Sequence, residues 1–360
     1  MKLCVIGTRG FPQVEGGVEK HCESIYPLMA KNSNMDITVF RRKPYVKGAA
    51  KEFENVRFVD LPSTRIKGFE AVLHSFLACI YAIKMRPDAV HIHNIGPCLF
   101  APLLKWSGIP VVMTYHSANY EHKKWGSGAQ KLLRFCERIA LKYADRIIFV
   151  SRFQMEKYPD DVQKKSVYIP NGVQRPVVTE KQNCLEKHGL EPEKYILSVG
   201  RITPEKGFHT LIEAFKKQYK PGWKLVIAGG VEFESGYMKQ LQALSEGIPV
   251  VFTGYVFGEE LAQLYANAGL YVLASENEGF PLVLLEAMSY RRNLLVSDIP
   301  ATQLIDLEQQ DYFPCGDAAA LAEKLAEKTM KPAERTYDLS AYEWQNVADR
   351  LSQVIAEAVR

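Results

Sequence analysis

Two pairs of charged residues in the second half of the chain have types and spacings that could do chemistry. Arg201 and Lys206 lie in "SVGRITPEKGF", directly after a short β-branched run, and Glu278 and Glu286 lie in "NEGFPLVLLEAMS". Two cations at the end of a strand suit a diphosphate, because each charge-assisted hydrogen bond contributes roughly 1.5–3 kcal/mol. A solvated arginine and lysine near a turn are the simpler alternative for the first pair.

The two glutamates bracket an apolar segment that is expected to begin a helix. Pro281 fits a first helical position, and the helix should then run on to Tyr290. Glu278 would lie in the loop before it, near free backbone N–H groups. Glu286, among leucines, would be costly to bury without a partner. A pair of sugar or ribose hydroxyls would satisfy its carboxylate, and so would a neighbouring cation such as Arg291.

A glycine-rich segment in the first half, "GTRGFPQVEGGVEKH", could present backbone N–H groups to an anion. Gly16 and Gly17 precede a helix expected to open at about Val18, and such an N-terminus suits a phosphate. The segment does not match the G-x-G-x-x-G dinucleotide fingerprint. The second predicted strand ends in three basic residues, 41–43, instead of the acid that holds an NAD ribose. A nicotinamide-dependent dehydrogenase is therefore disfavoured, and a ligand-free turn is the remaining alternative.

Three histidines of the first half belong to predicted strands. His116 closes the strand predicted at 110–116, so it should lie at a carboxyl end. A lone histidine is more often structural than functional. His91 and His93 lie inside the strand predicted at 89–94, and we assign them no metal.

Alternating strands and helices must position these residues. Short β-branched runs recur through both halves, and helical stretches separate several of them, which predicts parallel sheets with helices on their faces. The predicted strands are residues 2–7, 36–41, 56–61, 89–94, 110–116 and 146–151, and then 195–200, 224–229, 250–255, 270–275 and 293–298.

The chain is long enough for two domains, because 360 residues exceed the usual size of one. A turn cluster that ends at Gly172, followed by a polar stretch, places the boundary there. We therefore expect an α/β protein with two facing Rossmann-like, doubly wound domains at 1–172 and 173–340. Ligands should bind in the cleft beyond the strand ends. Residues 341–360 are expected to form a helix that packs on a domain already built.

Composition excludes several classes of protein. Seven scattered cysteines without a C-x-x-C pair indicate reduced thiols in a cytoplasmic protein, not a disulfide framework or a zinc site. We find no signal peptide, and no apolar span of the ~20 residues that cross a membrane. Residues 1–172 carry 26 Lys+Arg against 15 Asp+Glu, whereas residues 173–360 carry 19 against 26. A basic half favours anionic lipid or a phosphorylated substrate, or is merely a soluble surface; no nucleic-acid motif occurs.

Together these segments resemble glycosyltransferase family 4, whose members have the two-domain GT-B fold. The resemblance extends over essentially the whole chain. The co-occurrence of R-x4-K with the later E-x7-E is its most specific part. It implies metal-independent, retaining transfer of a sugar from a UDP-, GDP- or dTDP-sugar, with no cofactor, and no D-x-D metal clamp occurs in the sequence. The matching segments are "EGG", "TYHS", "VSRF", "IPNGV", "VGRITPEKG", "FTGYV" and "NEGFPLVLLEAMS".

The resemblance implies a role for each matching residue. The catalytic set would comprise Arg201 and Lys206 on the donor diphosphate, Glu278 on the transferred sugar, and His116 near the reacting carbon. Glu286 would bind the ribose hydroxyls. The other implied donor contacts are Gly16 and Gly17 at the diphosphate, Gly279 and Phe280 at the transferred sugar, Gly254, Tyr255 and Val256 near the base, and Pro281 and Leu282 in the same donor-binding segment.

The first half looks most like bacterial rhamnosyltransferases of capsule and O-antigen assembly, which act on lipid-linked acceptors at the inner face of the membrane. Val18 replaces an aromatic residue familiar in that group, which leaves the donor sugar open. Two alternatives remain, a nucleotide-sugar epimerase of the same architecture and a nucleotide-sugar-binding protein without catalysis. The expected patch for peripheral docking on an anionic membrane comprises Arg41, Arg42, Lys43, Lys47, Lys51, Arg65 and Lys67.

Overall fold

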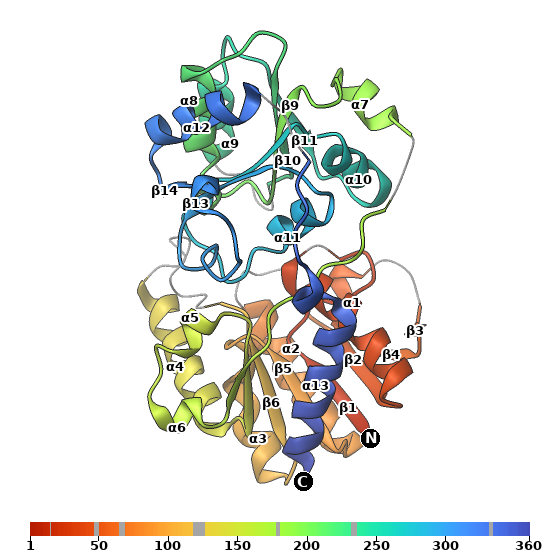
Figure 1. The fold of residues 1–360 in the computed structure, drawn as a ribbon. Coiled ribbons are helices and arrows are strands. Elements are labelled where there is room, and N and C mark those ends of the chain that lie inside the picture. Colours follow the sequence, from red (N-terminus) through yellow and green to blue (C-terminus); the bar gives the residue numbers. More distant parts are fainter. Residues whose placement is uncertain are drawn as a thin grey trace. The chain divides into compact units, whose positions relative to one another are not determined.

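The chain folds into two compact units, residues 1–172 with 341–360, and residues 173–340. The structure is a computed structural model (Figure 1). Each unit has its own sheet. The residues that the structure describes are 1–14, 16–46, 50–64, 69–117, 127–177, 181–231, 236–330 and 334–360.

The first unit is built on a sheet of eight strands in the order β3-β4-β2-β1-β5-β6-β7-β8. All neighbours are parallel except β3 and β4. The strand order reverses between β1 and β5, which is where open α/β sheets bind ligands. The strands are β1 Lys2–Ile6, β2 Asp36–Arg42, β3 Glu52–Phe53, β4 Val56–Leu61, β5 Ala89–His93, β6 Val111–Tyr115, β7 Arg146–Phe149 and β8 Ser166–Tyr168.

Helices from both ends of the chain cover this sheet. The C-terminal helix α13, Trp344–Val359, packs on α1 and on the strands β5, β6 and β7 (Figure 1). Ser33 and Ser352 share a hydrogen bond across the α1–α13 contact. The remaining helices are α1 Gly17–Asn32, η1 Lys43–Tyr45, α2 Phe69–Met85, η2 Pro97–Phe100, α3 Ala101–Trp106, α4 Ser127–Tyr143, α5 Arg152–Met155 and α6 Asp160–Gln163.

The second unit is built on a parallel sheet of six strands in the order β11-β10-β9-β12-β13-β14. Its strand order reverses between β9 and β12. The strands are β9 Tyr195–Val199, β10 Lys224–Ala228, β11 Val250–Gly254, β12 Leu270–Leu273, β13 Leu294–Asp298 and β14 Tyr312–Pro314. The helices are α7 Asn183–His188, η4 Pro204–Lys206, α8 Phe208–Lys217, α9 Gly236–Leu244, α10 Gly258–Ala266, α11 Leu282–Ser289, η5 Gln309–Asp311 and α12 Ala318–Met330, with η6 Ser340–Tyr342 at the crossing to the first unit.

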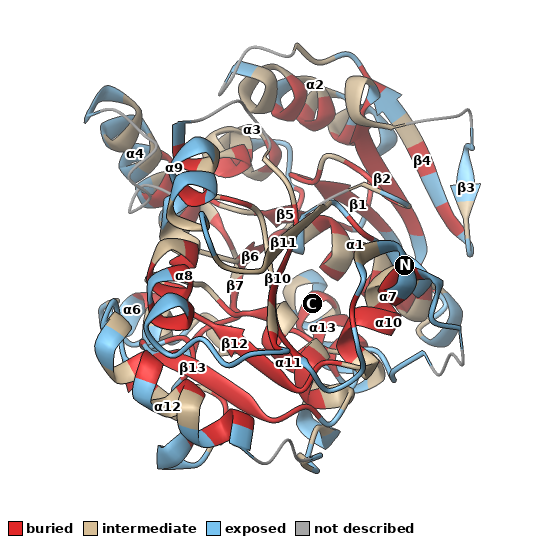
Figure 2. Cartoon of the chain, turned by 90° about the horizontal axis from the view of Figure 1, so that it is seen from above, coloured by how far each residue is buried: buried red, intermediate tan, exposed pale blue. Residues whose placement is uncertain are grey.

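Both sheets are buried on both faces, as expected for parallel strands with helical cover. Figure 2 shows the central strands as buried and the outer helix faces as exposed. Every residue of β5 and β6 is buried, and these strands include the polar residues His91, His93 and Thr114. Polar side chains in such strands need internal hydrogen-bond partners.

The predicted α/β fold class is confirmed, with a strand over each of the eleven predicted runs. The structure adds β3, β8 and β14, which have two or three residues each and are too short for a hydrophobic pattern. Helix α11 begins at Leu282, one residue later than predicted, because Pro281 keeps an extended backbone. Among the helices of the described residues, none is long and apolar enough to cross a membrane.

The predicted lipid-docking patch is wrong at Arg41 and Arg42. Arg41 is buried and makes a bidentate ion pair with Asp60 at 2.7 and 2.9 Å. Arg42 is also buried and lies 3.5 Å from Glu70. Both guanidinium groups are therefore buried in the first unit and paired with its carboxylates, so neither is available to bind lipid. Lys43 and Lys51 are exposed, whereas Lys47, Arg65 and Lys67 lie outside the described residues.

Candidate functional site

The two charged motifs of the second unit meet at one edge of its sheet. Lys206 lies in the turn after β9, and Glu278 lies in the loop after the neighbouring strand β12. The ammonium of Lys206 donates to Glu278 Oε1 at 2.5 Å, and Ser275 Oγ donates to the same oxygen at 2.7 Å. The side chains of Lys206 and Glu278 are only 16% and 12% exposed. The structure thus brings R-x4-K and E-x7-E into direct contact.

Close backbone packing fixes this contact. Gly207 adopts φ +64°, and a Cβ there would lie 1.9 Å from the carbonyl oxygen of Ala274. Only glycine tolerates both the left-handed backbone and the approach. The N–H of Glu276 donates to the carbonyl of Glu205 at 2.9 Å, which ties the two loops together. The glycine after the lysine is therefore needed to place Lys206 against Glu278.

Glu286 lies further along the same segment, in helix α11. Its carboxylate accepts a hydrogen bond from the hydroxyl of Tyr265 at 2.9 Å. Burial and the Glu286 carboxylate raise the pKa of Tyr265, so this phenol stays a neutral donor. Arg291, the alternative partner considered for Glu286, lies 3.5 Å from Glu334. Tyr265 stacks on Tyr290 with ring centroids 5.4 Å apart, which holds the phenol in place.

The N-terminus of α11 carries no side-chain cap, because Pro281 occupies the cap position. Its first backbone N–H groups therefore remain a positive helix end beside Glu278. Gly279 and Phe280 form the loop between them, and Phe280 is buried. A helix end of this kind favours an anion.

Glycine backbone lines the ends of β9, β10 and β11. Gly229 adopts φ +148°, and a Cβ there would lie 1.9 Å from the carbonyl oxygen of Gly200. The ring of Tyr255 lies on Gly230, where a Cβ would meet the ring at 2.5 Å. Tyr255 is 38% exposed and stacks on Phe257, with centroids 6.1 Å apart. Val256 is buried, whereas Arg201 follows Gly200 and is half-buried.

The glycine-rich turn of the first unit already holds a carboxylate. Glu19, in the first turn of α1, is buried, and its Oε1 accepts a hydrogen bond from the N–H of Arg9 at 2.9 Å. Its Oε2 lies so close to Gly16 that a Cβ there would be 1.9 Å away. Helix α1 starts at Gly17, so this acid balances the positive helix end. The sequence analysis missed Glu19, although Glu at the third helical position is a common N-terminal signal.

His116 lies in a histidine cluster, so the treatment of it as a lone histidine was wrong. It follows β6, and its Nε2 lies 2.9 Å from Nδ1 of His93, the last residue of the neighbouring strand β5. His21 of α1 packs edge-on against both rings, with centroids 5.0 and 5.6 Å away. Burial holds the pKa of His93 and of His116 well below the ordinary value, so both imidazoles are neutral.

A chain of hydrogen bonds supports this cluster from below. His93 Nε2 lies 2.5 Å from the hydroxyl of Tyr26, which also lies 2.9 Å from Nδ1 of His91. His91 Nε2 lies 2.7 Å from the hydroxyl of Thr114. The sequence analysis did not single out Tyr26. The H-x-H spacing of His91 and His93 was the available signal for this chain of hydrogen bonds, because residues two apart in a strand face the same side of the sheet.

Comparison with known proteins identifies the class of protein to which this chain is similar. Residues 15–175 match the family model described as Glycosyltransferase Family 4, and residues 180–338 match the one described as Glycosyl transferases group 1. The boundary between the two matches lies close to the division between the two structural units.

Several similar proteins align with this chain over nearly its full length and over nearly their own. The amylovoran biosynthesis glycosyltransferase AmsD of Erwinia amylovora is 22% identical over 93% of this chain and 92% of its own. The sucrose-phosphate synthase of Thermosynechococcus elongatus superposes with a TM-score of 0.82 at 22% identity, over 99% of this chain and 98% of its own. HepE of Anabaena, in complex with UDP and glucose, gives 0.79 at 17% identity, over 99% and 100%.

Two Rossmann-like units with this charged strand edge define a GT-B glycosyltransferase. The chain belongs to glycosyltransferase family 4, with the group 1 domain in its second unit.

Proposed function

We propose that this glycosyltransferase moves a sugar from a nucleoside-diphosphate sugar to a glycan acceptor, with retention of anomeric configuration and without a metal ion. The observation that carries the proposal is the 2.5 Å contact between Lys206 and Glu278. It joins a cation suited to a diphosphate and an acid suited to sugar hydroxyls at one strand edge. HepE, a solved neighbour of the same fold, binds UDP and glucose, which supports a nucleotide-sugar donor.

The donor diphosphate would lie between Arg201, Lys206 and the uncapped N-terminus of α11. A lysine ammonium has three donors, so Lys206 can keep Glu278 and still bind a phosphate oxygen. These groups would stabilise the charge that develops on the departing diphosphate, as an oxyanion hole does. No covalent nucleophile is required if the acceptor attacks from the leaving-group face and a diphosphate oxygen takes its proton.

The nucleoside would occupy the rest of the second unit's edge. Glu286, held by Tyr265 at 2.9 Å, would accept hydrogen bonds from the two ribose hydroxyls. The base would lie near Gly254, Tyr255 and Val256, where a half-exposed aromatic ring borders bare glycine backbone. Aromatic rings and glycine surfaces both suit a flat ligand.

The first unit would contribute further contacts to the donor. His116 would hydrogen-bond the transferred sugar near the reacting carbon, together with Glu278, Gly279 and Phe280 of the second unit. Gly16 and Gly17 would approach the diphosphate by their backbone. Because Glu19 places a carboxylate at that helix end, this last contact should be weak, and Arg201 and Lys206 should carry most of the phosphate binding.

The acceptor is proposed to be a lipid-linked glycan of capsule, O-antigen or exopolysaccharide assembly at the inner face of the plasma membrane. AmsD, a relative along nearly the whole chain, is named for the biosynthesis of amylovoran, which supports a role in polysaccharide assembly. Docking on anionic lipid would use helix α4, where Leu132 and Phe135 are 49% and 52% exposed beside Lys131 and Arg138. Such basic, amphipathic helices bind membrane surfaces.

Vesicle flotation tests the docking. At low salt, phosphatidylglycerol vesicles should carry the wild-type protein, and replacing Leu132 and Phe135 by serine should release it. The control changes Tyr219, a 42% exposed aromatic residue of the second unit, to serine. Equal flotation of all three proteins, or none with the wild type, would rule out docking through α4.

A thermal-shift screen against UDP, GDP, dTDP, ADP and NADP⁺, with and without Mg²⁺, tests the donor. A ligand at 100 times its dissociation constant adds about 2.7 kcal/mol to stability. A shift with one nucleoside diphosphate, equal in EDTA, supports the proposal and names the donor class. A shift with NADP⁺ alone would overturn it.

An epimerase of this fold would convert the donor sugar without any acceptor, and this acceptor-free conversion would distinguish it from a transferase.

A further inference from the structure

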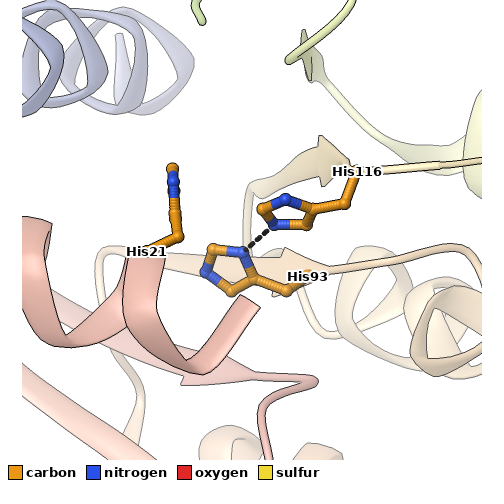
Figure 3. Close-up of side chains that lie close together, drawn as sticks. All are labelled: His21, His93 and His116. Atoms are coloured by element: carbon orange, nitrogen blue, oxygen red, sulfur yellow. Dashed lines mark hydrogen bonds between the residues drawn. The ribbon is translucent and has the colours of Figure 1, made fainter. Parts of the chain in front are cut away.

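Three histidines from separate elements of the first unit converge at the carboxyl edge of its sheet (Figure 3). His21 comes from α1, His93 ends β5 and His116 follows β6. One ring nitrogen from each histidine lies within 4.8 Å of the other two, and His93 and His116 are 2.9 Å apart at their closest nitrogens. No carboxylate belongs to this group in the described part of the chain.

The ring of His21 has one nitrogen with a hydrogen-bond partner and one without a partner among the described residues. Its Nδ1 lies 2.9 Å from Oδ1 of the buried residue Asn171. An amide oxygen only accepts hydrogen bonds, so Nδ1 carries the proton and Nε2 carries the lone pair. Nε2 is buried and has no hydrogen-bond partner among the described residues. Buried lone pairs of this kind call for a donor, a cation or a bound molecule.

The ring of His93 has a matching support. Its Nε2 lies 2.5 Å from the Tyr26 hydroxyl, which continues to His91. In the tautomer that donates from Nε2 to Tyr26, the Nδ1 of His93 is left as a lone pair that faces His116. Metal-binding histidines almost always have their second nitrogen held in this way by an oxygen atom. Asn171 and Tyr26 therefore fill the role of outer supports for two of the three rings.

We propose that His21, His93 and His116 form a binding site for a divalent transition-metal ion that prefers imidazole ligands, such as Zn²⁺. Zinc binds histidine nitrogen at about 2.0–2.1 Å, so two ligands of a tetrahedral site lie roughly 3.4 Å apart. The separations of 2.9 Å and up to 4.8 Å bracket that value, so small side-chain shifts suffice. Three histidines leave a fourth position for water or a ligand.

The chemistry of the site selects against the common hard cations. Mg²⁺ and Ca²⁺ bind oxygen ligands, whereas this group offers nitrogen alone. With His93 donating from Nε2 to Tyr26, the proton between the two rings belongs to Nε2 of His116 and can move to Nδ1 of that ring, so the ion binds without net proton release.

An ion at this site would regulate transfer instead of assisting it. This consequence, unlike the binding itself, rests on the proposed function, in which His116 contacts the transferred sugar. A metal bound to His116 takes one of its two nitrogens and adds positive charge there. We expect Zn²⁺ to inhibit transfer and Mg²⁺ to leave it unchanged.

Calorimetric titration of Zn²⁺ into the full chain, free of histidine tags, tests the site. The wild type should bind one ion. His21→Gln should weaken binding by more than about 100-fold, and Asn171→Ala, which keeps all three ligands, by about 10–100-fold. His188→Gln, in the second unit, should match the wild type. Equal affinity in all four proteins, or no binding by the wild type, would overturn the proposal.

Two further readouts separate the possible failures. Co²⁺ in place of Zn²⁺ should give the intense visible absorption of a four-coordinate ion with the wild type, which does not depend on the folding of any variant. A pale, six-coordinate spectrum would contradict the site. If Zn²⁺ binds as proposed but does not inhibit transfer, the metal site stands and the assignment of His116 to the sugar fails.

Discussion

The two units share one architecture but present different chemistry beyond their strands. The second unit places Arg201, Lys206 and Glu278 in loops past β9 and β12, where the side chains are partly exposed. The first unit places His93 inside β5, fully buried, and His116 directly after β6. A charge stays ionised only where water or a counter-ion reaches it, whereas a group inside a sheet must be neutral and hydrogen-bonded.

This difference has a functional meaning for the proposed reaction. The diphosphate is the charged part of the donor, and its partners lie in the unit that keeps its cations ionised. The hydroxyl groups of the transferred sugar are uncharged. A neutral imidazole can donate a hydrogen bond to them or accept one from them without attracting the phosphate. The substitutions below should therefore differ between the two units, both in the size of their effect and in whether they change transfer kinetics or stability.

Lys206→Ala should have the largest effect on transfer. We expect kcat/KM to fall by about 100- to 1,000-fold, roughly 3–4 kcal/mol, because a fixed cation no longer stabilises the departing diphosphate. Steady-state kinetics with saturating acceptor measures this. Lys217→Ala, an exposed lysine of the same unit, is the control and should behave as wild type. Activity of Lys206→Ala within threefold of wild type would remove the charged edge from the mechanism.

Tyr26→Phe should act mainly on stability. The hydroxyl is the shared partner of His91 and His93, and its loss leaves buried ring nitrogens unsatisfied. We expect a loss of about 2 kcal/mol in the free energy of urea unfolding, with little dependence on salt because no ion pair is involved. Tyr81→Phe, at a 45% exposed tyrosine, should change nothing. Unchanged stability in Tyr26→Phe would show that the chain of hydrogen bonds is not intact.

Glu286→Gln should raise the KM for the donor about tenfold, roughly 1.4 kcal/mol, and leave kcat nearly unchanged. The ribose contact is the same in the ground state and the transition state, so its loss weakens binding uniformly. Glu213→Gln, an exposed glutamate on α8, serves as the control. A fall in kcat at constant KM would move Glu286 from the ribose to the reacting sugar.

The smallest effect is expected from His74, a buried histidine of α2. Burial, and then Arg42, lower its pKa to about 4, against an ordinary value near 6.5. As pH falls from 7 to 5.5, the unfolded chain takes up a proton that the folded chain does not, so stability falls. His74 should contribute about 1 kcal/mol of this loss. Urea unfolding of His74→Gln at both pH values should show a correspondingly smaller loss; an identical loss would contradict this assignment.

The fold was largely predictable because its signals are local. Parallel strands such as β1 and β5 are continuous apolar runs, and glycine or proline punctuates the segments between them. The misses are also physical. Arg41 and Arg42 form part of a basic run in sequence, but Asp60 and Glu70, which neutralise them, come from separate elements. No one-dimensional charge pattern reveals such a pairing.

The site was only half predictable for the same reason. Residue type and spacing single out Arg201, Lys206 and the two glutamates, because charged residues that follow a buried strand are expected at the edge of the sheet. The contact of Lys206 with Glu278 depends on the pairing of β9 with β12, in which Ile196 lies opposite Leu270 and Leu197 lies opposite Tyr271. These strands are far apart in the sequence, so only the fold brings their following loops together. The histidine cluster likewise depends on tertiary contacts, because Tyr26 and His21 of α1 meet His93 at the end of β5.

One measurement tests the central claim most directly: release of nucleoside diphosphate from UDP-, GDP- and dTDP-sugars by the purified protein in EDTA, compared with Lys206→Ala. The account predicts metal-independent release from at least one donor class and its near loss in the variant. No release from any donor, or equal release by both proteins, would contradict it.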